Sequence, residues 1–323
     1  MMIAMFKETT SSDNTMEAVT QMRKIVGKQC FISGMSGVVT DIKNLVMQEI
    51  PIYVTIAAVL SLIVLFATME SFAVAFLFLL SIGMAIIYNL GSNVFFGEIS
   101  YVTQALAAVL QLGVTMDYSI FLWHSYEENQ ERFPDDKKRA MAHAISNTLT
   151  SVIGSSITTV AGFIALCFMS FTLGLDLGVT MAKGVIFGVI CCVTVLPSMI
   201  LVFDKAIDKT RHKAIIPDLG VISGWVVKHY KAFIVTFIIV LIPALWGYTH
   251  YEVYYDLAGT LPGNLDSVVA NDKLDETFAM NSTHIILCDS SLEPKEVNEM
   301  MSKIDDVDGV KAVSYTHLTL PTT

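Results

Sequence analysis

Charged side chains are scarce in this sequence of 323 residues: Asp, Glu, Lys and Arg together make up 15%, against 54% hydrophobic residues. Soluble globular proteins carry about one quarter charged residues, so the composition excludes an ordinary soluble enzyme. A disordered chain is excluded as well, because it would be poor in apolar residues. The formal net charge of −10 argues against nucleic acid as a partner, since nucleic acid requires a basic surface.

Cysteine is sparse too, with 5 residues. Three of them (Cys167, Cys191 and Cys192) lie in apolar runs as small hydrophobic residues, and Cys30 and Cys288 alone make no disulfide framework. Nucleotide-binding loops, hydrolase nucleophile motifs and metal-binding patterns are absent from the sequence. We therefore expect no enzyme activity, no cofactor and no metal, with energy supplied by an ion gradient or a partner.

Long apolar runs, by contrast, are abundant, and the mean hydropathy is +0.60. A helix needs about 20 apolar residues to cross a bilayer. Six segments qualify: 51–69, 72–93, 99–124, 144–169, 177–203 and 230–250. The first two are separated by a tight link around Glu70 and Ser71, and Pro197 and Pro243 should kink the spans that contain them. The predicted fold class is an all-α membrane bundle of six transmembrane helices.

The distribution of basic residues sets the direction of the chain across the membrane. Lys and Arg gather in the loops 125–143 and 204–231, whereas the loops 94–98 and 170–176 contain none. By the positive-inside rule the two basic loops are cytoplasmic. Both ends of this multi-pass chain are then extracytoplasmic.

The flanks of the membrane block are predicted to be parts of small α+β modules. Helices are expected over about 15–29, with Asn14-x-x-Glu17 as the candidate cap of its first turn, and over Glu293–Ile304. Strands are expected at Met1–Phe6, 29–33, His284–Cys288 and Gly309–Val313.

The last residues, Val313–Thr323, resemble read-through of a transposase adapter when they are back-translated. We expect this segment to be a scar and the natural chain to continue beyond about Ala312. A genuine polar tail is the alternative.

Asp117 is the most informative residue, in the run Gly113-Val-Thr-Met-Asp-Tyr-Ser-Ile-Phe-Leu122. It is expected about 10 Å inside its span, where an ionised carboxylate costs about 2.5–3.5 kcal/mol on insertion scales. A carboxyl group that protonation can neutralise suits a reversible proton carrier. The alternative is a structural Asp that is hydrogen-bonded to a neighbouring helix.

Polar residues near Asp117 form two stripes on the same helix. One stripe repeats every seven positions: Gln104, Gln111, Tyr118 and Ser125. Asp117 and His124 lie one position over. Such stripes face a bundle interior or a wet path. His124 would pass protons at the cytoplasmic mouth or, in the interpretation we favour, simply lie at the interface.

The next two spans supply candidate partners for Asp117. The fourth is rich in hydroxyl groups, which allow tight helix packing; Ser155, Ser156 and Thr159 are candidates for bonding to Asp117 or leading water to it. Lys183 in the fifth span is expected to reach the outer interface with its ammonium group, or alternatively to pair with a carboxylate.

These motifs resemble the MMPL branch of the RND transporter superfamily. The similarity rests on Gly113–Leu122 with its Asp-Tyr pair, Ser155-Ser-Ile-Thr-Thr-Val-Ala-Gly-Phe163, Lys183-Gly184, and Leu196-Pro-Ser-Met-Ile-Leu201 followed by Phe203-Asp204. It covers residues 48–204 well and the flanks loosely. The same block is similar to sterol-sensing domains.

The resemblance implies a division of the chain into segments of a two-halved transporter. Residues 1–47 would end a first extracytoplasmic porter domain, and 48–204 would form a five-helix membrane domain. A cytoplasmic linker (205–229), the family's seventh helix (230–250) and the start of a second porter domain (251–312) would follow, before the scar at 313–323. The chain would then be a fragment whose second half is missing.

The resemblance further implies a proton-driven exporter of lipids, drugs or other amphipathic molecules in a bacterial plasma membrane. Asp117 would carry the proton and Tyr118 would be its hydrogen-bonding companion, with protons as the coupling ion and no cofactor. The implied partners are the bilayer, an amphipathic substrate and the second half; a homo-oligomer stays open. A lipid-sensing or scaffold domain without transport, and an accessory of protein export, are the alternatives.

Overall fold

The computed structural model describes residues 4–27, 30–97, 99–212, 220–252, 259–278, 286 and 292–310. This part of the chain is helical and contains no strand, only an isolated bridge between Ser71 and Arg211. In chain order the elements are α1 (Asp13–Val26), α2 (Met35–Thr68), α3 (Phe72–Gly91), η2 (Ser92–Phe95), α4 (Tyr101–Arg132), α5 (Lys137–Leu166), α6 (Thr172–Ile190), η3 (Cys191–Val195), α7 (Leu196–Val202), α8 (Asp204–Lys209), α9 (Gly220–Lys228), α10 (Tyr230–His250), α11 (Asp266–Phe278) and α12 (Pro294–Asp305).

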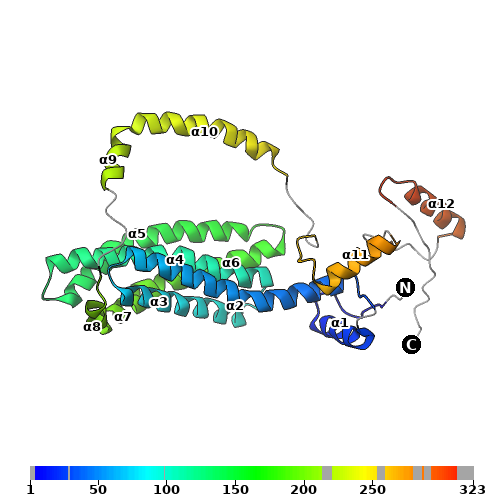
Figure 1. The fold of residues 1–323 in the computed structure, drawn as a ribbon, viewed down its shortest axis with the longest axis horizontal. Helices are drawn as coiled ribbons and strands as arrows, with labels where there is room; N and C mark the ends of the chain where they lie inside the picture. Colours follow the sequence, from blue (N-terminus) through cyan, green and yellow to red (C-terminus); the bar gives the residue numbers. More distant parts are fainter. Residues whose placement is uncertain are drawn as a thin grey trace. The chain divides into compact units, whose positions relative to one another are not determined.

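Among the described residues, six helical segments are long and apolar enough to cross a membrane, which confirms the predicted spans. They are α2, α3 with η2, α4, α5, α6 continued through η3 and α7, and α10. The largest differences from the predicted bounds are in α2, which begins at Met35, well before its apolar run, and in α4, which continues to Arg132. The helices α5 and α6 also begin earlier than predicted, at Lys137 and Thr172. Figure 1 shows α2 to α7 side by side as a bundle.

Local sequence explains where these helices end. Pro134 lies between α4 and α5, and a residue that precedes proline disfavours the α conformation. Asp136 then caps α5, because its side chain accepts a hydrogen bond from the backbone N–H of Arg139 at 3.0 Å. Pro197 cannot donate to the preceding turn, and the stretch just before it, η3, is π-helical.

The interior of the bundle changes character along its length. An apolar core fills the half that holds the α2–α3 link and the α4–α5 turn; its largest fully buried side chains include Leu65, Met69, Phe78, Leu122, Trp123, Tyr126, Met141, Leu196 and Ile200. In the other half, the residues between α3, α4 and α6 include buried amide groups, among them Asn89 and Gln111. The bundle is therefore packed by apolar side chains at one end and hydrogen-bonded at the other.

The flanks agree only in part with the α+β prediction. The predicted helices are present as α1 and α12, and α12 begins with a capping box between Glu293 and Glu296. The strand predictions are not supported, since Ala4–Phe6, residues 30–33 and Gly309–Val310 are described and are not strands. Met1–Ile3, residue 29, residues 311–313 and the predicted strand at His284–Cys288, apart from Ile286, lie outside the described residues.

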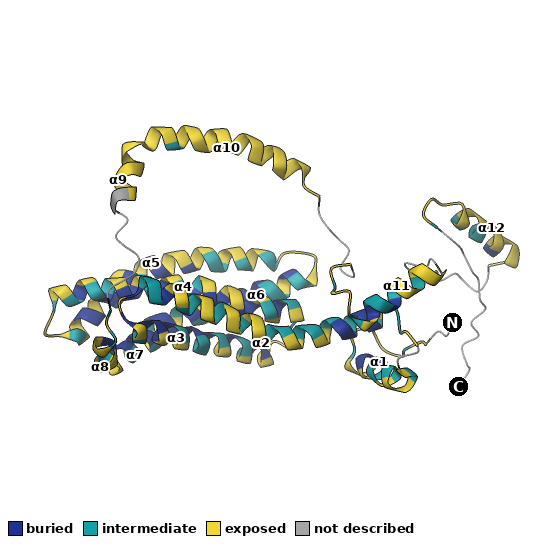
Figure 2. Cartoon of the chain, viewed as in Figure 1, coloured by how far each residue is buried: buried dark blue, intermediate teal, exposed yellow. Residues whose placement is uncertain are grey.

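The chain divides into two compact units, Met1–Val268 and Val269–Thr323. Within the first unit α10 differs from the other spans, because none of its described residues is buried. Figure 2 shows this as a helix almost entirely in the exposed colour, whereas α3, α4 and α6 carry buried faces. The second unit contains α12, where Val297 is buried.

Candidate functional site

Asp117 lies near the middle of α4, about 23 Å from either end at 1.5 Å per residue. The helix continues past the predicted span through the charged stretch that ends at Arg132. The side chain of Asp117 lies on the exposed surface of the bundle. Tyr118, the next residue, is only 3% exposed and belongs to the apolar core. The two residues of the motif therefore point in different directions, one out of the bundle and the other into it.

The polar stripes of α4 divide in the same way. In the seven-residue stripe, Gln111 and Tyr118 are buried, Ser125 is half-buried and Gln104 is exposed. The stripe of Asp117 and His124 is exposed. Adjacent positions on a helix are 100° apart, so one step along the sequence carries a side chain from the core to the surface. The carboxylate at membrane depth is thus outside this bundle, where we had expected a bundle interior or a wet path.

His124, two turns along α4 from Asp117, contacts a carboxylate that the sequence argument did not single out. Its Nδ1 is 3.4 Å from Oε2 of Glu127. The other carboxylate oxygen of Glu127 is buried and has no hydrogen-bond partner among the described residues. Nothing in the charged stretch after His124 distinguishes Glu127 from Glu128, since only the packing of α4 leaves the first half-buried and the second exposed.

The hydroxyl groups of α5 bond mainly to their own helix. Ser156 donates to the carbonyl of Val152 at 2.5 Å, and Thr159 donates to the carbonyl of Ser155 at 3.1 Å. Ser155 itself is exposed. No hydrogen bond joins any of them to Asp117 within the described part of the chain. These bonds satisfy the hydroxyl groups inside the membrane. None of them reaches Asp117, so they do not support a relay role for these residues.

Lys183 extends toward the end of the bundle at which α6 begins. Its Nζ donates to the side-chain oxygen of Asn93 at 2.5 Å and lies 4.8 Å from the centre of the Phe96 ring. Asp176, the carboxylate one might expect beside it, instead accepts from the backbone N–H of Ser100 at 2.7 Å and from the hydroxyl of Thr103 at 2.6 Å. Asp176 thereby caps the first turn of α4 from a neighbouring helix.

A buried amide network joins α3, α4 and α6. Gln111 Nε2 donates to the carbonyl of Gly184 at 3.1 Å, and Gln111 Oε1 accepts from Asn89 Nδ2 at 2.9 Å. The direction is forced, because a backbone carbonyl can only accept. Gly184 leaves room for this network, since a Cβ at this position would lie 2.6 Å from Asn89 Nδ2 and would displace the amide. Sequence reasoning noted Lys183-Gly184 as a motif but could not see what the glycine contacts.

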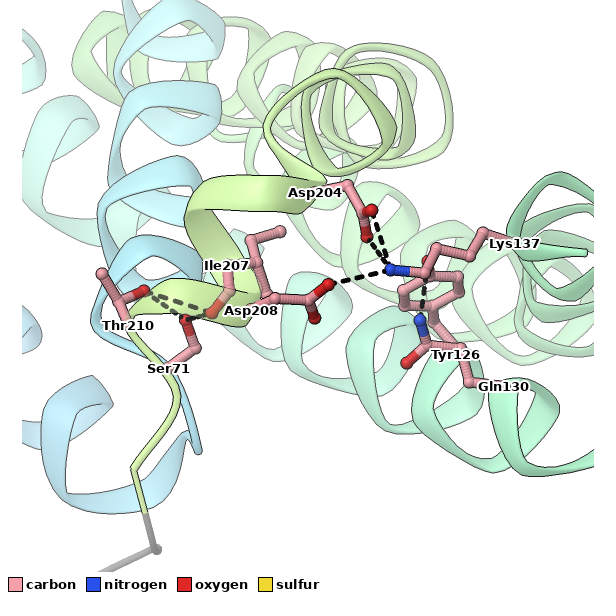
Figure 3. A network of polar contacts seen from close by, with 8 residues as sticks. All are labelled: Ser71, Tyr126, Gln130, Lys137, Asp204, Ile207, Asp208 and Thr210. Carbon is pink, nitrogen blue, oxygen red and sulfur yellow. Dashed lines mark hydrogen bonds and ion pairs between the residues drawn. The ribbon is translucent and has the colours of Figure 1, made fainter. Parts of the chain in front are cut away.

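A second polar network, drawn in Figure 3, joins α8 to α5 and to the α2–α3 link. Lys137 Nζ donates to both carboxylate oxygens of Asp204 at 2.7 Å and to Asp208 at 3.1 Å. The Ser71 hydroxyl is 3.2 Å from the carbonyl of Ile207 and 2.9 Å from the hydroxyl of Thr210. These contacts hold α8 against the N-terminal ends of α3 and α5.

A third polar contact lies at the opposite end of α2. Asp41 is buried and accepts two hydrogen bonds from the guanidinium of Arg23 in α1, at 2.5 and 3.0 Å. It also accepts the backbone N–H of Ser267, in the first turn of α11, at 2.9 Å. Nearby, Lys43 Nζ is 2.6 Å from Asp13, and this hydrogen bond holds the pKa of the Asp13 carboxyl below its ordinary value. None of these residues was predicted, because the pairing spans distant parts of the sequence.

Comparison with known proteins gives consistent matches. The MMPL family matches residues 4–229. The membrane protein MJ1562 of Methanocaldococcus jannaschii is 35% identical over 99 residues, which cover 30% of this chain and 25% of the relative. ActII-3 of Streptomyces coelicolor is 29% identical over 126 residues, or 39% of this chain and 17% of the relative.

A third relative aligns with most of the chain. SCO5905, another membrane protein of Streptomyces coelicolor, is 24% identical over 279 residues, which cover 80% of this chain. That alignment covers only 33% of the relative. The chain therefore spans about a third or less of the length of the curated relatives that it matches.

Proposed function

This chain belongs to the MMPL family, and we propose from that membership that it is part of a proton-driven exporter of amphipathic molecules such as lipids or drugs. It is a multi-pass membrane protein, with six apolar helices of membrane length in the described part of the chain. We place it in the plasma membrane, with the basic loops in the cytoplasm and both described ends outside. Asp117 is the proposed proton carrier.

The observation that carries the proposal is the position of Asp117 on the surface of the bundle. An ionised carboxylate that faced lipid at this depth would cost about 2.5–3.5 kcal/mol on insertion scales. It would be tolerated if another protein surface covered it or if it became protonated. A carboxyl group that can be either covered and ionised or protonated is suited to switching between two packed states.

The proposed cycle follows from these two forms of Asp117, ionised and protonated. When Asp117 is ionised, the bundle favours a partner surface that offers hydrogen bonds or water to the carboxylate. Protonation removes the charge, and the partner surface can then take up a different packing. Tyr118 packs in the core next to Asp117, so its ring would fix the rotation of α4 that presents the carboxylate outward.

The test is Asp117→Asn in the intact protein, with Glu128→Gln as the control. Glu128 is exposed, and among the described residues its ion pair is with Arg132 one turn away. The compound to follow is a dye, detergent or lipid that accumulates in cells when the gene is deleted. Deletion cells complemented with each variant are preloaded with this compound, and export is measured as its loss from the cells. Asp117→Asn should reduce export at least tenfold at unchanged abundance, and Glu128→Gln should leave it unchanged.

The outcomes separate the alternatives. Normal export by Asp117→Asn would refute the proton-carrier proposal and favour a lipid-sensing or scaffold role, in which Asp117 is only a structural group. If deletion alters no amphipathic compound but impairs protein secretion, an accessory role in protein export takes its place.

A further inference from the structure

Lys183 is an isolated positive charge in the apolar part of the chain. It is the only Lys or Arg in residues 44–131 and 140–204, two stretches that include most of the bundle helices. It lies about 16 Å along α6 from Thr172, the first residue of that helix, at 1.5 Å per residue. None of the ion pairs among the described residues includes it. A charged side chain at membrane depth is costly without a partner, and such residues mark functional sites.

The ammonium group of Lys183 is held by an amide rather than by a carboxylate. Its Nζ donates to Oδ1 of Asn93 at 2.5 Å, and Asn93 is only 6% exposed. Because an ammonium group can only donate, the amide oxygen faces it and the amide nitrogen, Nδ2, is left for another partner. Nδ2 is buried and has no hydrogen-bond partner among the described residues. Buried donors are normally paired, so Asn93 carries an unused donor beside the remaining donors of Lys183.

A hydrogen-bonded part of the bundle holds Asn93 in this place. One turn before it, Asn89 donates to Gln111, which in turn donates to the carbonyl of Gly184, the residue after Lys183. This network fixes α3 against α6 next to the ammonium group. Oδ1 of Asn89 also lacks a partner among the described residues, but Asn89 is fully buried within the network. Asn93 is the amide nearer the end of the bundle, and it is therefore the one that a ligand can meet.

The surroundings of Lys183 combine this charge with an apolar surface. The centre of the Phe96 ring lies 4.8 Å from its Nζ, and Phe96 is 63% exposed. The preceding residue, Phe95, is exposed as well. The acid of α6, Asp176, is engaged elsewhere, because it accepts two hydrogen bonds at the start of α4. A cation without a counter-charge beside exposed aromatic rings suits a molecule that has an anionic headgroup and an apolar tail.

We propose that Lys183 and Asn93 bind the phosphate headgroup of an amphipathic molecule that the exporter carries. The inference rests on the proposed function, because it names the chemical class of the transported compound. Nζ of Lys183 and Nδ2 of Asn93 donate to oxygens of the headgroup, and the tail lies over Phe95 and Phe96. Charge-assisted hydrogen bonds to phosphate are stronger than bonds between neutral groups, so the site favours an anionic headgroup over a neutral or cationic one.

The probe is dodecyl phosphate, and its binding to the intact protein in dodecyl maltoside is measured by titration calorimetry. Lys183→Gln removes the charge and should weaken binding at least tenfold. Asn93→Asp gives Lys183 a permanent counter-ion in place of the amide, so it should weaken binding by a similar factor at an unchanged thermal midpoint. Lys138→Gln is the control, because it removes one exposed Lys from the other end of the bundle and should leave the affinity unchanged.

Several results would overturn the proposal. A wild-type protein that does not bind dodecyl phosphate would mean that the ammonium group is already satisfied within the chain. Wild-type affinity in Lys183→Gln would mean that the charge plays no part in binding. If Lys183→Gln does not fold, Asn93→Asp decides in the same way, since it adds a charge without a change of size.

Two further ligands separate the headgroup from the tail. Dodecyltrimethylammonium has the same tail and the opposite charge, and it should bind the wild type at least tenfold more weakly than dodecyl phosphate. Equal binding would show that the surface recognises only the tail. Inorganic phosphate should also bind at least tenfold more weakly. If it binds as tightly as dodecyl phosphate, the site is one for a free anion, and the assignment of an amphipathic ligand is wrong.

Export distinguishes a transported compound from a phospholipid that resides in the bilayer. Deletion cells complemented with each variant are preloaded with dodecyl phosphate, and its loss from the cells is followed. Lys183→Gln should lower this export at least fivefold, whereas Lys138→Gln should not change it. If Lys183→Gln loses binding but exports at the wild-type rate, the site holds a resident lipid and the assignment to the substrate is overturned.

These outcomes are distinguishable from failure of the proposed function, because the binding measurement requires no transport. If Asp117→Asn exports normally while Lys183→Gln loses both binding and export, the proton-carrier proposal fails and the headgroup site stands. If Asp117→Asn abolishes export while Lys183→Gln binds and exports like the wild type, only the headgroup inference fails.

Discussion

At the scale of single residues, glycine decides how closely α4 and α6 can approach. Gly184 leaves room for the amide network, and Gly188, one turn further, faces Thr115 of α4. A Cβ on Gly188 would lie 2.1 Å from Cγ2 of Thr115, a distance that real atoms do not reach. Small residues at such positions let helix backbones approach in membranes.

Gly188→Ala should therefore destabilise the bundle by about 1–3 kcal/mol, the usual cost of overpacking. The measurement is the thermal midpoint of the detergent-solubilised protein. Gly113→Ala is the matched control, because nothing lies within 4 Å of its added Cβ, and its midpoint should not change. Adding Thr115→Ser removes the clashing methyl group and should restore much of the loss. A Gly188→Ala protein as stable as the wild type would contradict the close approach.

At the scale of elements, α8 depends on polar contacts because it is only a short helix, Asp204–Lys209, in which Ile207 alone is buried. Lys137 holds it to α5 through Asp204 and Asp208. Without the ammonium group, two neighbouring carboxylates would be left without a counter-charge. The side chains are 36% and 27% exposed for Lys137 and Asp204, so the pair is worth about 1 kcal/mol or less after solvent screening.

We expect Lys137→Ala to loosen α8 without unfolding the bundle. Amide hydrogen exchange over residues 204–210 should quicken severalfold, and high salt should produce a similar change in the wild type but none in the variant. Lys138→Ala is the control, since Lys138 is the exposed neighbour with the same charge. Unchanged exchange in Lys137→Ala would show that the hydroxyl contacts of Ser71 and Thr210 hold α8 by themselves.

At the scale of the whole molecule, the outer surface of the bundle is not expected to contact lipid everywhere. The face of α4 that carries Asp117 also carries Phe121, which is 58% exposed, while Leu80 of α3 is 55% exposed on an apolar surface. Only the first of these surfaces includes a carboxylate at membrane depth. It should therefore contact protein or water, and the second should contact lipid.

Spin labels can distinguish the two surfaces in the intact protein. A label at Phe121→Cys should collide with lipid-soluble oxygen at least threefold less often than one at Leu80→Cys, both in a cysteine-free background. The labelled proteins are compared in lipid bilayers. Equal oxygen accessibility would mean that Asp117 faces lipid, which would remove the physical basis for a partner surface.

Much of this architecture could be predicted from the sequence. Six spans, the tight link at Glu70 and Ser71, the helices α1 and α12 and the family itself all follow from local patterns: apolar runs of membrane length, capping residues and short motifs. These features depend on neighbours in the chain, and the bilayer imposes a length that composition alone reveals. The strands predicted at the described parts of the flanks, Ala4–Phe6, residues 30–33 and Gly309–Val310, were not supported, because short apolar runs do not distinguish a strand from a loop.

The tertiary structure decided what each polar group contacts. The sequence placed Asp117 and Tyr118 side by side, but only packing shows that one is exposed and the other is in the core. Asp41, Arg23 and Ser267, like Lys137 and Asp204, come from distant positions, and no local pattern marks them as partners. A hydrogen bond requires two groups within about 3 Å in a specific direction, a condition that helix packing sets and that composition and periodicity do not contain.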